Sequence, residues 1–159
     1  MTDTGTSKRT SLGVYGSRTL KDERVKIILM EEIEKYGVTE MVTAAAPGGV
    51  CEVARDLCKE KAIPLTLYFL DFQFRRGAFE HRSIASLKGA ERAVFIHDGV
   101  SRGTANELKL ARKMGIPYSL YTMKPTKHNS VMGFEIEEEW SEAHFEPLTF
   151  EGIGGGDGK

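Results

Sequence analysis

The sequence repeats one pattern along most of its length: a short apolar run, a turn, and then a segment with apolar residues at helical spacing. The apolar runs predict strands near residues 12–15, 40–45, 65–69, 93–97 and 118–123. Strands that alternate with helices are joined by right-handed crossovers, so they lie parallel in a sheet with helices on both faces. The pattern therefore predicts an α/β fold, a Rossmann-like three-layer sandwich with a five-stranded, mainly parallel sheet.

Four helices are expected between these strands, because apolar residues recur there every three or four positions. This spacing covers residues 25–36, 50–62, 78–88 and 104–114. Gly37 suits the left-handed turn that ends a helix, and the pattern is weakest over residues 78–88. Residues 71–77 are polar and aromatic and are expected to form a loop.

The two ends of the chain lie outside the repeating pattern, which assigns the Rossmann-like domain to residues 12–123. Residues 1–11 are polar and predict a flexible leader without the apolar core of a secretion signal. Residues 124–150 predict an appendage at the edge of the sheet. The glycine-rich residues 151–159 predict a disordered tail, because ordering them would cost backbone entropy with little burial in return.

Length and composition limit the number of domains and the classes of partner. A length of 159 residues fits one domain with its own core. A formal net charge of −1 does not favour nucleic acid as a partner. No segment approaches the roughly 20 apolar residues of a membrane span. Cys51 and Cys58 are separated by two turns of one predicted helix, too far apart for a disulfide, and indicate reduced core thiols. The leader without a secretion signal and the lack of a membrane span predict a cytoplasmic protein. No cofactor and no metal site are predicted.

Glycine and polar residues follow the first two predicted strands. In open α/β sheets, ligands bind beyond the carboxyl ends of the strands, where helix N-termini present N–H groups to anions. Gly16, Ser17 and Arg18 supply a tight turn, a hydroxyl and a guanidinium after the first strand. Gly48 and Gly49 allow a phosphate or sugar to approach the next helix. Both turns also fit a fold without ligand, and the two interpretations stay open.

The turn after the fourth predicted strand holds Ser101, Arg102, Gly103 and Thr104. Their hydroxyl and N–H groups suit a phosphate. Glu107 follows Thr104 at the spacing of a capping box, so it is either a helix cap or an active-site carboxylate.

Arginines cluster before and within residues 78–88. Arg82, on the sheet-facing side of this helix, would need an anionic partner such as a phosphate. Arg75 and Arg76 are interpreted as a solvated basic face.

Taken in order, these residues resemble a known family. The set Gly16-Ser17-Arg18, Gly48-Gly49, Leu70-Asp71-Phe72, Arg82 and Ser101-Arg102-Gly103-Thr104 is similar to the motifs of the SLOG superfamily, named for SMF/DprA and the LOG cytokinin-activating enzymes. Within it, residues 12–123 resemble the small stand-alone YspA-like proteins most. The resemblance implies a nucleotide or nucleotide-derived ligand bound by these residues, Asp71 included, and a homodimer.

Residues 99–107 are similar to the LOG stretch Pro-Gly-Gly-x-Gly-Thr-x-x-Glu. The resemblance places Glu107 on the catalytic glutamate of LOG enzymes and Arg82 on their arginine. The Pro-Gly-Gly of the phosphate turn is replaced here by Gly99-Val100-Ser101. Cys51 and Ser83 stand where related small proteins carry an aspartate and an asparagine.

Two functions are expected from these features. The first is a binding module that senses or sequesters a nucleotide without turnover. The second is an N-glycosidase that releases the base from a nucleoside 5′-monophosphate, with Glu107 stabilising the oxocarbenium-like transition state and orienting water while Arg82 holds the substrate. A third class, a single-strand DNA-binding or scaffolding domain, is disfavoured by the near-neutral charge and by the absence of a basic, aromatic pattern.

Overall fold

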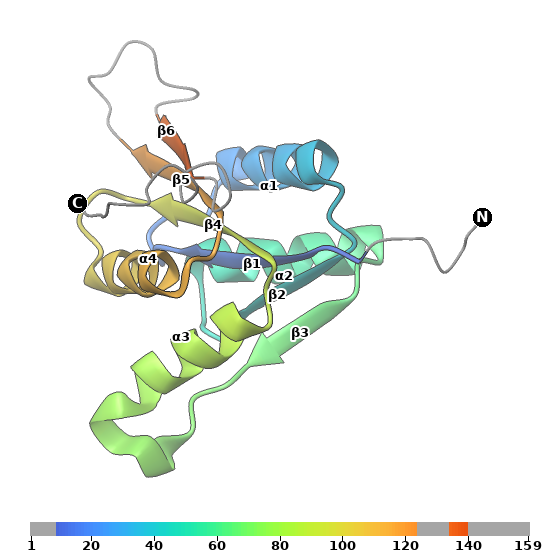
Figure 1. The fold of residues 1–159 in the computed structure, drawn as a ribbon. Helices are drawn as coiled ribbons and strands as arrows, with labels where there is room; N and C mark the ends of the chain where they lie inside the picture. Colours follow the sequence, from blue (N-terminus) through green and yellow to red (C-terminus); the bar gives the residue numbers. More distant parts are fainter. Residues whose placement is uncertain (1–8, 124–133, 140–159) are drawn as a thin grey trace.

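Strand β1 (Ser11–Gly16) lies inside a six-stranded sheet with the order β3-β2-β1-β4-β5-β6. The computed structural model describes residues 9–123 and 134–139 (Figure 1). Strands β2 (Glu40–Ala44), β3 (Leu65–Tyr68), β4 (Arg92–His97) and β5 (Tyr118–Met123) pair in parallel with their neighbours around β1. The predicted parallel sheet is confirmed, and each predicted strand end lies within one residue of the observed end.

The strand order reverses direction between β1 and β4. The chain proceeds from β1 to β2 and β3 on one side, then crosses to β4 and β5 on the other. At such a switch point the turns that follow the two central strands lead away to opposite sides, and a crevice opens between them.

The sixth strand, β6 (Phe134–Glu139), corrects the predicted count of five. It pairs antiparallel with β5, with Met123 opposite Phe134 and Leu120 opposite Glu137. The sequence predicts only an edge appendage over residues 124–150, whereas β6 belongs to the sheet and buries Phe134 completely. An antiparallel neighbour needs no crossover helix, so the βα pattern does not include it. The rest of that segment, residues 1–8 and residues 151–159 lie outside the described residues.

The helices cover both faces of the sheet, as the three-layer prediction requires. Helices α1 (Glu23–Tyr36) and α2 (Gly49–Lys61) pack on one face against Leu12 and Val14 of β1. Helices α3 (Ala78–Lys88) and α4 (Arg102–Met114) meet the other face, where Tyr15 belongs to their core cluster. Successive β1 side chains thus point to opposite layers. None of the helices in the described ranges is both long and apolar enough to cross a membrane.

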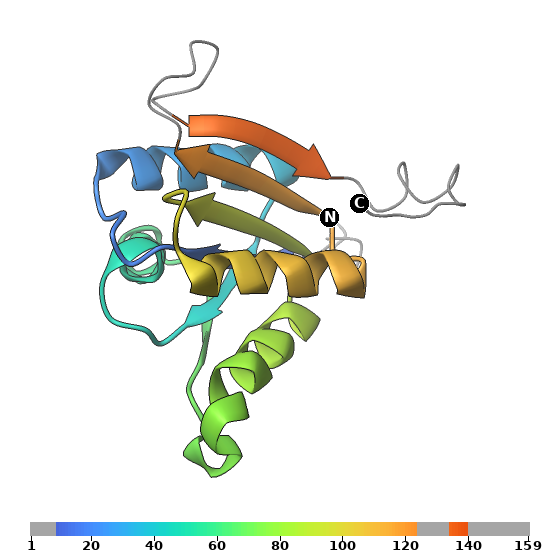
Figure 2. The same cartoon turned by 90° about the vertical axis from the view of Figure 1, so that its left-hand side faces the viewer.

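The structure confirms the predictions for Gly37 and the two cysteines and corrects those for Ser11 and for residues 71–77. Gly37 ends α1 in the left-handed conformation, and Cys51 and Cys58 are buried free thiols. Ser11, assigned to the leader from the sequence, is the buried first residue of β1. Residues 71–77 are not simply a loop, because they include the short 3-10 helix η2 (Phe72–Gly77). Figures 1 and 2 show η2 and the start of α3 projecting away from the sheet.

Glycines allow the end of β1 to lie against the start of α2. A Cβ atom on Gly16 would lie 2.5 Å from Cγ2 of Val50. Gly49 has φ +67°, and a Cβ atom there would overlap Cα of Arg18 and lie 2.5 Å from the carbonyl oxygen of Ser17. In this arrangement the Val50 N–H donates to the Ser17 carbonyl oxygen at 3.2 Å. The first two loops therefore meet backbone to backbone.

We predict that Gly48→Ala and Gly49→Ala differ in stability although both residues have positive φ. Gly48 has φ +72° with nothing within 4 Å of an added Cβ, so Gly48→Ala costs only its backbone strain, about 1–3 kcal/mol. Gly49→Ala adds the overlap with Arg18 and lowers the free energy of unfolding further. Urea unfolding of both variants tests this, and equal losses would show that the close approach does not require glycine.

Candidate functional site

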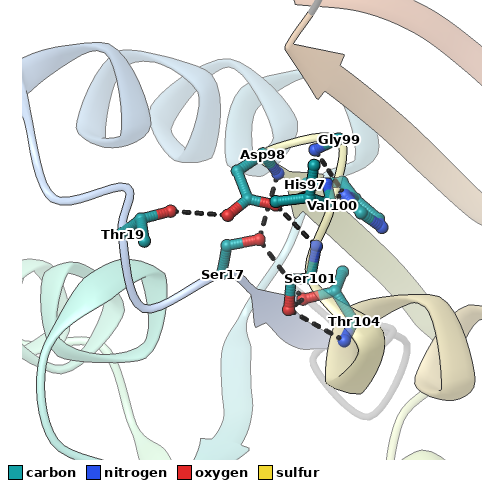
Figure 3. Close-up of polar contacts among 8 residues, drawn as sticks. All are labelled: Ser17, Thr19, His97, Asp98, Gly99, Val100, Ser101 and Thr104. Atoms are coloured by element: carbon teal, nitrogen blue, oxygen red, sulfur yellow. Dashed lines mark hydrogen bonds and ion pairs between the residues drawn. The ribbon is translucent and has the colours of Figure 1, made fainter.

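Ser17 connects the ends of the two central strands. Its N–H donates to the carbonyl oxygen of Ile96 at 3.1 Å, and its Oγ accepts from the N–H of Asp98 at 3.0 Å (Figure 3). The same Oγ lies 3.5 Å from Oγ1 of Thr104 at the start of α4. Ser17 is 1% exposed, so this residue, predicted to bind ligand, lies beneath the site and holds its turns together.

Asp98 organises the turn between β4 and α4. Its carboxylate accepts from the N–H groups of Val100 at 2.9 Å and Ser101 at 2.8 Å, and from Oγ1 of Thr19 at 2.7 Å (Figure 3). Burial alone would raise the pKa of Asp98, but these hydrogen bonds, together with the interaction of its carboxylate with the Ser17 side chain, outweigh burial and lower the pKa to about 2. The carboxylate is therefore ionised at neutral pH and fixes the turn. Sequence reasoning missed this residue, although Asp before Gly is typical of such turns.

Helix α4 begins earlier than predicted, and this changes the interpretation of Glu107. The N-cap is Ser101, whose side chain accepts from the N–H of Thr104, so the helix starts at Arg102 and not at Thr104. Glu107 consequently lies in the second turn and is not the partner of a capping box. The helix-cap interpretation is wrong: the Glu107 carboxylate instead accepts from Oγ of Ser83 on α3 at 3.3 Å.

A cavity of about 550 Å³ opens beyond the carboxyl ends of the central strands, between the starts of α2 and α4 and the side of α3. This volume is in the range of small-molecule sites. Eight of the predicted residues line it: Gly16, Arg18, Gly48, Arg82, Ser101, Gly103, Thr104 and Glu107. The cavity thus joins motifs from four separate parts of the chain.

Four other predicted residues do not line the cavity. Ser17 and Gly49 lie behind it in the contact between the first two loops. Asp71 caps η2 by accepting from the N–H of Gln73 at 3.2 Å. Arg102 is exposed at the first position of α4.

Sequence reasoning missed much of the lining on η2, α3 and α4. These residues are Arg76 on η2, Phe79, Glu80 and Ser83 on α3, and Asn106, Lys109 and Leu110 on α4. Arg76, interpreted as part of a solvated face, lines the cavity. Within α3 and within α4, lining residues recur three or four positions apart, which places them on one face of that helix. This spacing alone does not identify a cavity lining, because the sequence does not show that these faces of α3 and α4 oppose each other.

Cations outnumber anions in the cavity. Arg18, Arg76, Arg82 and Lys109 line it together with only two acidic side chains, Glu80 and Glu107. Within the described ranges, neither Arg18 nor Arg76 forms an ion pair with another side chain. The cavity therefore presents a positive environment to an anion.

Glu107 has an unusual protonation equilibrium for a carboxyl group near arginine. Burial raises its pKa, and the Ser83 hydrogen bond and the charge of Arg82 only partly offset this, so the pKa is about 7. The group is then divided between its neutral and ionised forms near neutral pH. A carboxyl group with such a pKa can exchange a proton with a bound ligand. Beside it, burial raises the pKa of Cys51, which stays a neutral thiol.

Comparisons of the chain with protein-family models, with curated proteins and with solved structures gave no match. The resemblance to the SLOG superfamily therefore stays a prediction from the motif residues.

We predict that Glu107→Gln changes how stability depends on pH. The folded pKa of Glu107 is raised from 4.5 to about 7, so the folded state holds a proton that the unfolded chain releases. Wild-type stability relative to Glu107→Gln is highest below about pH 4.5, falls as pH rises through about 7, and is then lower by up to about 3 kcal/mol. Urea unfolding at pH 4, 6 and 8 measures the difference. A difference that is constant across this range would contradict the raised pKa.

Proposed function

We propose that this protein binds a nucleotide or another phosphorylated nucleoside in the cavity at the β1–β4 switch point. The observation that carries the proposal is the convergence of two helix N-termini on one cation-rich cavity. Gly48 precedes α2, and Ser101, Gly103 and Thr104 form the start of α4. The position, the helix ends and the cations each favour an anionic ligand with a phosphate group.

The phosphate is assigned to the starts of α2 and α4. The first N–H groups of a helix have no carbonyl partner within the helix, and the helix dipole favours negative charge there. Gly48 has no side chain with which to cap α2, and an added Cβ on Gly48 or Gly103 would meet nothing within 4 Å. A phosphate therefore has room to approach the backbone at both turns. Arg18 lines the same part of the cavity from the loop after β1 and supplies a guanidinium.

We predict that Gly103→Ala weakens ligand binding without harming the fold. Alanine fits the helical backbone at this open position and stabilises it by about 0.5–1 kcal/mol relative to glycine. Its methyl group would occupy space that the phosphate needs, so affinity for nucleoside 5′-monophosphates should fall at least about tenfold, a loss of about 1.4 kcal/mol. Calorimetric titration measures the affinity, and urea unfolding measures the stability.

Arginine variants provide the matched control. Arg82→Ala removes a cavity cation and should also weaken binding, whereas Arg75→Ala removes an exposed arginine outside the lining and should not. The proposal fails if the wild-type protein binds none of the monophosphates, or if Gly103→Ala and Arg82→Ala bind them as tightly as Arg75→Ala does.

A second function, cleavage of the N-glycosidic bond, is favoured by the position of Glu107. In this reaction a nucleoside 5′-monophosphate and water give the free base and ribose 5-phosphate. The ionised Glu107 carboxylate would stabilise positive charge on the sugar ring and accept a proton from the attacking water. Glu107 lines the cavity, does not cap its helix and has a pKa of about 7, which are the properties such a role requires.

We predict for this second function that Glu107→Gln abolishes turnover but retains the ligand. The amide keeps the shape and a hydrogen-bond partner for Ser83, while it cannot accept the proton. Base release should fall at least about a hundredfold with affinity changed by less than about threefold. Chromatography of free base after incubation with a panel of nucleoside monophosphates measures this. If the wild-type protein binds a monophosphate and releases no base, the binding function stands alone.

A further inference from the structure

Four phenylalanines in and beside the projecting η2–α3 region are exposed to solvent, which is costly for apolar rings. The exposed fractions are 68% for Phe69, 74% for Phe72, 42% for Phe74 and 54% for Phe79. Among them, Phe79 alone lines the cavity. We refer to residues 72–82, which comprise η2 and the first turns of α3, as the arm (Figure 2).

The arm is held in a defined shape by its own contacts. The rings of Phe74 and His81 stack with centroids 3.9 Å apart and an interplanar angle of 16°. Between them, Arg75 has φ 49° and ψ −115°, a strained backbone that folds the chain back on itself. Asp71 caps η2 at the start of the arm. The Phe74–His81 stack and the Asp71 cap therefore fix the shape of the chain around the start of α3, where Phe79 lies.

Phe79 lines the cavity from α3, whereas the helix N-termini in the lining belong to α2 and α4. Its neighbours on the lining include Arg76, Glu80 and Arg82 from the same arm. The guanidinium of Arg82 lies 5.5 Å from the Phe79 ring centroid, in the range of a cation–π contact. The ring is nevertheless about half exposed, so much of its surface is free for a second planar group. The lining thus combines the N-termini of α2 and α4 with an aromatic ring from α3.

We infer that Phe79 is a base-stacking residue, so the ligand of this cavity is a nucleoside phosphate and not a phosphorylated sugar alone. This inference rests on the proposed function, because the phosphate at the starts of α2 and α4 sets which end of the ligand reaches the arm. A planar base on Phe79 covers apolar ring surface that water now contacts. The Arg82 guanidinium, already over the ring, extends the same stacked surface.

Calorimetric titration with adenosine 5′-monophosphate and with ribose 5-phosphate tests the inference, because the two ligands differ by the base. The wild-type protein should bind the nucleotide at least about tenfold more tightly, as stacking of one base provides. Phe79→Ala should remove that difference by weakening the nucleotide about tenfold and leaving ribose 5-phosphate within about twofold. Phe79→Tyr should keep it, and Phe72→Ala, which removes an exposed ring outside the cavity, should behave as wild type.

The outcomes separate the two proposals. If neither compound binds, both the proposed function and the stacking role are overturned. If both bind with equal affinity, or if Phe79→Ala weakens both to the same extent, the phosphate site stands and the stacking role is overturned. If Phe72→Ala matches Phe79→Ala, the effect belongs to the arm as a whole and Phe79 is not the stacking residue.

Discussion

The Asp98 carboxylate ties the end of β4 to the loop after β1, and the cavity depends on this connection. The carboxylate accepts from two N–H groups of its own turn and from Thr19 across the switch point. Hydrogen bonds to an ionised group are stronger than those between neutral partners. With Ser17 bridging the same strands, they set the separation of the two turns. The N–H groups at the start of α4 are consequently in place before any ligand arrives, and binding need not pay to order them.

The cavity lining places Glu107, a carboxyl group with a pKa of about 7, among three arginines and a lysine. A phosphate beside Glu107 favours the neutral carboxyl form, since two anions repel each other. A positively charged sugar ring favours the ionised form. A pKa of about 7 makes both forms accessible at little cost. The same group is therefore compatible with both proposed functions, retention of a nucleotide and cleavage of one.

The parallel sheet could be predicted from the sequence because the strand, turn and helix of each βα unit have their own local sequence pattern. A strand run, a glycine turn and an amphipathic helix are visible without tertiary information. Three features required the tertiary structure. β6 pairs antiparallel without a helix, the start of α4 moved the cap from Thr104 to Ser101, and the lining of α3 and α4 depends on two helices that face each other. Glu107 illustrates the reason: a shift of the N-cap by three residues, from Thr104 to Ser101, places Glu107 outside the capping box and in the cavity lining.

The arm has a consequence for how this architecture can diversify. No residue of η2 is buried, so substitutions there disturb little of the hydrophobic core. The turns before α2 and α4 are constrained by Gly16 and Gly49, where an added Cβ would clash, and by Asp98, whose carboxylate accepts from the turn. Tolerance to mutation is thus unequally distributed around a single cavity. Substitutions in η2 can thus change part of the cavity lining, at Arg76, while the turns before α2 and α4, and the fold with them, stay the same.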